Sequence, residues 1–163
     1  MLRLIIFLCV TLSTETLMAK EIFIHSKNPT SMRLAILEDN EKVAFLYLTK
    51  PDTQIPEKDA VAYSRVPLVA TVDWKKIKET GDVPPLTKDV ASSLAIIQNP
   101  IETEFSFMWS ADGHAVALLR NNLPIAFAST TEKFGYSKAV VKPSTLANPW
   151  DQPRFEAIFK KLP

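Results

Sequence analysis

Cysteine is almost absent from this sequence of 163 residues. The single Cys9 lies in the N-terminal stretch that we expect to be removed, so the processed chain would form no disulfide and offer no thiol nucleophile. Small secreted domains of animals are usually rich in disulfides. The lack of cysteine therefore favours a bacterial periplasm over an animal extracellular space.

Glycine and net charge are also scarce. Three glycines in the whole chain leave no glycine-rich loop of the kind that cradles phosphate. Nineteen basic residues and 18 acidic residues give a formal net charge of +1. Near-neutral charge argues against nucleic acid or an anionic membrane surface as the main partner.

Long apolar runs are missing except at the N-terminus, where the pattern is that of a signal peptide. Arg3 is followed by the apolar run 4–12 and by a more polar segment that ends at Ala19. The run has roughly half of the ~20 apolar residues that a membrane span needs, so we favour a signal over a membrane anchor. A lipid anchor on Cys9 is disfavoured because the bulky Phe7 and Leu8 precede the cysteine. We expect residues 1–19 to be removed. Residues 20–163 would then form one domain without a membrane span, in the periplasm or secreted.

Alternating apolar residues and turn signals predict an antiparallel sheet. Apolar runs at 32–38 and 43–49 flank a polar tetrapeptide, which is typical of a β-hairpin, and residues 22–25 form a possible strand before it. Further along, Asp112-Gly113 and Asn121-Asn122 are turn pairs. They separate three expected strands at 105–109, 115–120 and 123–128, which would form a meander.

Helices are expected at three places. Asp73 and Gly81 delimit a short helix at 73–79, whose Trp74 would face the core. A second helix is expected at 87–95, although 94–97 could equally begin a strand. The apolar stripe Phe155, Ile158, Phe159 and Leu162 predicts an amphipathic C-terminal helix at 151–162.

These elements predict an α+β fold. It would contain a mainly antiparallel sheet, a meander of about five to seven strands, with two or three helices that include the C-terminal one. The proline-containing stretch 51–67 is expected to be a surface loop, and 134–141 a further strand. The apolar stripe of the C-terminal helix could cover this sheet or another chain.

The stretch 104–137 resembles a family of small uncharacterised bacterial proteins, a domain of unknown function. The shared pattern is a Trp-Ser-x-Asp-Gly turn, here 109–113, then Ala-Leu-Leu, here 117–119, then Asn122, Pro124 and Ala126, and finally a Gly-Tyr pair, here 135–136. The chain has Leu123 and Ser137 where the family pattern has Gly and Cys. The resemblance implies the α+β fold and no particular activity.

No cluster of residues predicts catalysis, a metal site or a cofactor. Ser110, Asp112 and His114 have the residue types of a hydrolase triad, but a tight turn between them does not aim the serine at the histidine. The two histidines, His25 and His114, are far apart in the sequence and do not by themselves indicate metal binding. We therefore expect no catalytic residue, no metal and no cofactor.

The aromatic side chains are the better indication of function, because Trp and Tyr are enriched at recognition surfaces. We select Trp109, Asp112, Tyr136 and Trp150 as candidate binding residues. The resulting hypothesis is an exported bacterial protein that binds another envelope or secreted protein without catalysis, as an immunity protein or inhibitor does. The alternatives are a small-ligand binding module with an aromatic groove, and an atypical hydrolase.

Overall fold

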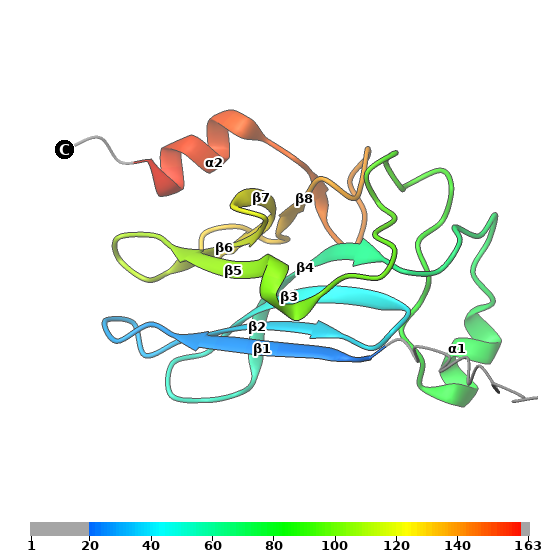
Figure 1. Ribbon diagram of the computed structural model, residues 1–163, viewed down its shortest axis with the longest axis horizontal. Coiled ribbons are helices and arrows are strands. Elements are labelled where there is room, and N and C mark those ends of the chain that lie inside the picture. The colour runs from blue at the N-terminus through cyan, green and yellow to red at the C-terminus, as the bar shows by residue number, and fades with distance from the viewer. Residues whose placement is uncertain (1–19, 161–163) are drawn as a thin grey trace, which may run out of the picture.

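The computed structural model describes residues 20–160, which form two β-sheets and two α-helices (Figure 1). The predicted signal peptide at 1–19 and Leu162 of the predicted helix lie outside the described residues. The α+β class is confirmed. The prediction of a single sheet is wrong, because the strands divide into a four-stranded and a five-stranded sheet.

The first sheet is antiparallel, with its strands in the order of the sequence. Its members are β1 (Ile22–Lys27), β2 (Leu34–Asp39), β3 (Val43–Thr49) and β4 (Pro56–Ser64). The predicted hairpin is thus confirmed as β2 and β3. In its turn, Asn40 Oδ1 accepts hydrogen bonds from the amides of Lys42 and Val43, and Glu41 adopts a positive φ of 70°.

Strand β4 contradicts the prediction of a loop at 51–67. Pro56 is the first residue of the strand, a position where its missing N–H costs little, and the apolar residues 60–63 follow it into the core. A bulge between Ala44 and Phe45 allows β4 to pair with β3 along its length. The prolines therefore bound a strand rather than a loop.

The second sheet is mixed and begins with the predicted meander. Its members are β5 (Phe105–Trp109), β6 (Ala115–Arg120), β7 (Leu123–Ser129), β8 (Tyr136–Ser137) and β9 (Asn148–Pro149). Asn121 and Asn122 have φ values of 50° and 64°, as a tight hairpin turn requires. Strands β8 and β9 pair in parallel, and the strand predicted at 134–141 is reduced to two residues.

The main core lies between the two sheets. Tyr63 of β4 stacks on Phe105 of β5, with ring centroids 5.5 Å apart, so this side of the first sheet faces the second. The residue of β3 opposite Tyr63 is Ala44, which is fully buried. Leu46 and Leu48 lie on the same side of β3 as Ala44 and are fully buried too. Phe45 and Tyr47 consequently point to the other side of the first sheet.

A buried ion pair fastens the end of β2 to the end of β4. The Asp39 carboxylate is 1% exposed and accepts a hydrogen bond of 2.5 Å from the Tyr63 hydroxyl. The guanidinium of Arg65 approaches the same carboxylate to 2.7 Å. Removing one member of such a pair is costly, because a buried charge then loses its partner.

The C-terminal helix α2 (Gln152–Phe159) covers the other face of the second sheet (Figure 1). Asp151 caps it by accepting from the Arg154 amide at 2.9 Å. Phe155 is 3% exposed and packs on Phe127 of β7, with ring centroids 5.9 Å apart. The amphipathic helix is confirmed, and its apolar face packs on this chain's own sheet.

Helix α1 (Trp74–Thr80) is confirmed together with its caps. Asp73 accepts from the Lys76 amide, and Gly81 ends the helix with a φ of 69°. The prediction that Trp74 faces the core is wrong, because its side chain is 58% exposed. No residue of this short helix is buried. Neither described α-helix is long and apolar enough to cross a bilayer.

The prediction of a helix at 87–95 is wrong. One turn closes locally, with the Ala91 amide donating to Thr87 O at 2.9 Å, but the turn does not continue as a helix. The next amide, that of Ser92, donates to Ala139 O, and Ala91 forms an isolated bridge with Val140, so long-range pairing ends the turn here. Close to this segment the chain makes one turn of 3-10 helix, η1 (Glu102–Glu104), before β5.

Candidate functional site

The hairpin turn between β5 and β6 holds the serine, aspartate and histidine considered above. Ser110 Oγ donates to Asp112 Oδ1 at 2.6 Å and accepts from the Ala115 amide at 2.9 Å. Asp112 Oδ1 also accepts from the His114 amide at 3.0 Å. These bonds close the turn, and the partners of the serine hydroxyl are the aspartate and the backbone rather than the imidazole. The geometry is therefore that of a structured turn.

The side chain of His114 is held by Arg33 from the loop between β1 and β2. Arg33 Nε donates to His114 Nδ1 at 3.2 Å, which leaves the proton of the neutral imidazole on Nε2. The same guanidinium donates to Thr49 O at 2.7 Å and pairs with Glu57. The Arg33 side chain is 9% exposed, and its bonds link the loop after β1 to the end of β3, the start of β4 and the β5–β6 turn.

Two of the candidate binding residues come together beneath α2. Tyr136 stacks on Phe127 with centroids 4.7 Å apart, and Trp150 meets the same ring edge-on at 5.3 Å. The Trp150 indole donates to Gln152 Oε1 at 2.9 Å, and the Lys138 ammonium lies 4.7 Å from its ring centroid. This aromatic cluster mainly seats the helix on the sheet, with Trp150 half-buried at its margin.

The other two candidates lie elsewhere. Trp109 ends β5, and its indole donates to Ser26 Oγ of β1 at 3.2 Å, linking one edge of each sheet. Asp112 lies in the turn that follows. The structure thus pairs Tyr136 with Trp150 and separates them from Trp109 and Asp112, and a binding role for these four stays a prediction.

The side of the first sheet that faces away from the second has a different character. Cross-strand pairing aligns two rows of side chains on it, because residues opposite each other share a face. We call this surface the outer face and define it by Phe23, His25, Ile36, Glu38, Phe45, Tyr47 and Asp59.

Aromatic rings form the middle and one edge of the outer face. Phe45 and Tyr47 stack with centroids 6.0 Å apart, and Phe23 meets His25 edge-on at 6.3 Å. Phe23 is 59% exposed on the edge strand β1. Of the other rings, His25 is exposed, Tyr47 is half-buried and Phe45 is buried at 7% exposure. A large exposed apolar side chain such as Phe23 beside them is typical of a surface that binds another molecule.

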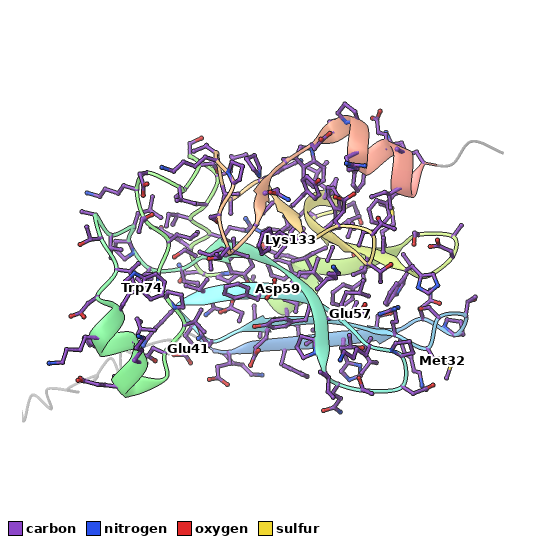
Figure 2. All side chains as sticks on the ribbon, turned by 180° about the vertical axis from the view of Figure 1, so that it is seen from behind. Met32, Glu41, Glu57, Asp59, Trp74 and Lys133 are labelled. Atoms are coloured by element: carbon purple, nitrogen blue, oxygen red, sulfur yellow. The ribbon has the colours of Figure 1, made fainter. Side chains whose placement is uncertain are left out.

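The charges of the outer face are acidic. Tyr47 lies opposite Asp59 in the pairing of β3 with β4, and Figure 2 shows Asp59 on β4 with Glu57 further along the same strand. Burial, and then the carboxylates of Glu38 and Asp59, raise the pKa of Tyr47 to about 12. Burial alone raises the pKa of Asp59. Within residues 20–160, no side chain donates a hydrogen bond or forms an ion pair with the Asp59 or Glu38 carboxylate.

No group of three or more potential ligands among the described residues is placed to hold a metal ion. His25 lies on the outer face and His114 in the β5–β6 turn, where Arg33 occupies its Nδ1. The structure therefore assigns the two histidines to separate surroundings.

Comparison with known proteins found no matching family model, no similar curated protein and no similar solved structure. The resemblance of residues 104–137 to a bacterial family accordingly stays a prediction.

The candidate binding residues selected from the sequence include none of Phe23, Tyr47, Asp59 and Arg33. The alternation of Phe23 and His25 with Ile22 and Ile24 was the available signal for an outward-pointing ring on a strand. Asp59 has no such signal, because the sequence of its strand predicts a loop.

Proposed function

We propose that the protein is an exported bacterial domain that binds another envelope or secreted protein without catalysis, in the manner of an immunity protein or inhibitor, and that the outer face is its binding surface. The observation that carries the proposal is the row of aromatic side chains on this face, with Phe23 exposed at its edge. Aromatic residues surrounded by polar ones are enriched where protein interfaces are strongest.

The charges of the outer face support a partner with basic side chains. Glu38 and Asp59 flank Tyr47 and have no cation of their own among the described residues. A lysine or arginine of the partner would pair with Asp59 and lie against the face of the Tyr47 ring. Such complementarity raises the association rate and makes it sensitive to salt.

The test is a binding experiment with matched variants. Residues 20–163 are immobilised and exposed to envelope and secreted fractions of bacteria, and the protein that is retained is identified and purified. Phe23→Glu then places a charge at the exposed ring of the proposed contact, whereas Ile101→Glu introduces the same charge at an equally exposed side chain outside the outer face.

We expect Phe23→Glu to weaken binding of the purified partner at least tenfold and Ile101→Glu to leave it unchanged. The pair Glu38→Gln and Asp59→Asn should slow association and flatten its dependence on salt. Retention of the partner at full affinity by all outer-face variants would refute the assignment of this surface. A column that retains no stoichiometric partner would refute the protein-binding function itself.

A further inference from the structure

A second surface feature lies at the far side of the molecule from the β5–β6 turn, where β7 begins. It is a cleft of about 360 Å³ between the start of β7, the segment 93–97 and the residues after β8. We call it the β7 cleft. Its walls are formed mainly by the apolar side chains Leu94, Ile97, Leu123 and Ile125.

The apolar residues at the rim of the β7 cleft are unusually open to solvent. Leu94 is 64% exposed and Leu123 is 67% exposed, on two segments that are far apart in the sequence. Covering such side chains is favourable by ~25 cal/mol for each Å² removed from water. The volume is within the ~300–1,000 Å³ of clefts that bind small molecules.

The ionisable side chains of the β7 cleft are both cationic. They are Arg120 and Lys138, and no acidic residue lines it. Arg120 is already paired with Glu104 at 2.9 Å. Lys138 forms no ion pair within residues 20–160 and instead places its ammonium over the ring of Trp150. Lys138 lines the cleft and has no carboxylate partner among the described residues, so its ammonium can bind an anionic group by turning from the Trp150 ring toward the cleft.

We propose that the β7 cleft binds the alkyl chain of a medium-chain fatty acid such as laurate and that Lys138 binds its carboxylate. The apolar walls match the chain, and the one cation without a carboxylate partner, Lys138, matches the single negative charge. This inference does not depend on the proposed function, because the cleft and the outer face share no residue.

The geometry supplies its own spectroscopic signal. Trp150 is one of three tryptophans, and a carboxylate bound by Lys138 would change the cation next to its ring. Residues 20–163 are titrated with laurate below its critical micelle concentration, and both tryptophan fluorescence and the heat of binding are followed. We expect saturable binding of one laurate per chain, with dodecyltrimethylammonium and acetate binding at least tenfold more weakly.

Variants separate the two parts of the site. Leu123→Ser and Lys138→Gln should each weaken laurate binding about tenfold, which corresponds to ~1.4 kcal/mol. Ile101→Ser and Lys75→Gln change an exposed leucine-sized residue and an exposed lysine outside the cleft, and should have no effect. Trp150→Phe should abolish most of the fluorescence change while the heat of binding remains.

Three results would overturn the proposal: an absence of saturable laurate binding, equal affinity for dodecyltrimethylammonium, or full affinity in Leu123→Ser and Lys138→Gln. Circular dichroism of each variant confirms that the fold is intact, so that a loss of binding reports on the cleft. Failure here would leave the partner-binding test untouched, since Phe23→Glu and Leu123→Ser alter different surfaces.

Discussion

Alkaline pH should destabilise this protein through its tyrosines. The chain has three, and the surroundings raise the pKa of each. Burial is the largest cause of the raised pKa for every tyrosine. The carboxylates of Glu38 and Asp59 raise the pKa of Tyr47 further, and the hydrogen bond to Asp39 raises the pKa of Tyr63 further. In the unfolded chain the same phenols titrate near pH 10.

The sign and size of the effect follow from proton linkage. A group whose pKa is higher in the folded state contributes stability that is complete below its unfolded pKa and is lost as the pH rises. At about pH 11, a phenol that stays protonated in the folded state costs ~1.4 kcal/mol of stability, because its unfolded form is mostly ionised. For Tyr63 we expect this full loss. For Tyr47, which is only half-buried, we expect ~0.5–1 kcal/mol because solvent screens part of the effect.

The assay compares urea unfolding at about pH 8 and about pH 11, where the free energy of unfolding should differ by roughly 2 kcal/mol from Tyr47 and Tyr63 alone. Tyr47→Phe provides the matched control, because it removes one titrating phenol and should reduce the difference by ~0.5–1 kcal/mol. In parallel, the ultraviolet absorbance of tyrosinate should stay low in the folded protein at about pH 10.5 and rise on unfolding. Three folded tyrosines that titrate with a midpoint near pH 10 would refute the reasoning.

Three further changes test the packing. Asp39→Asn leaves a buried guanidinium without its counter-charge and should lower the free energy of unfolding by ~3–5 kcal/mol in urea. Gly113→Ala should lower the free energy of unfolding more than Gly81→Ala. Both glycines have a positive φ, which costs an alanine ~1–2 kcal/mol. A Cβ at Gly113 would in addition lie 2.4 Å from Asn28 Oδ1, whereas a Cβ at Gly81 would meet open space. Equal losses would contradict the close approach of the two loops. Phe155→Ala removes the buried ring of α2 and should cost ~3–5 kcal/mol in thermal or urea unfolding; a loss below ~1 kcal/mol would mean that the helix is not docked.

The predicted elements that are confirmed are those set by short-range physics. The β2–β3 and β6–β7 hairpins follow from alternating apolar residues on either side of Asn-containing turns. The two helices follow from Asp73 and Asp151, whose side chains accept from backbone amides three residues later. Each of these interactions is made within a few residues of chain.

The predictions that failed concern residues whose partners are distant in the sequence. Residues 87–95 have a helical composition but form backbone bonds to residues near 139, and proline-bounded β4 is a strand because β3 offers it a partner. Trp74 has helical spacing with Ile77, yet α1 packs no buried residue, so the ring stays exposed. Periodicity describes which face of an element is apolar but not whether another element covers it.

The sequence by itself determined the α+β class, the turns, the helix caps and the absence of a disulfide framework in residues 20–163, because these depend on composition and local backbone preference. Only the tertiary structure decided that the strands divide into two sheets, and that α2 covers this chain's own second sheet. It also placed Phe23, Tyr47 and Asp59 on one outer face, and Leu94 beside Leu123 in the β7 cleft. Those residues lie on separate strands and loops, and the packing of the sheets brings them together.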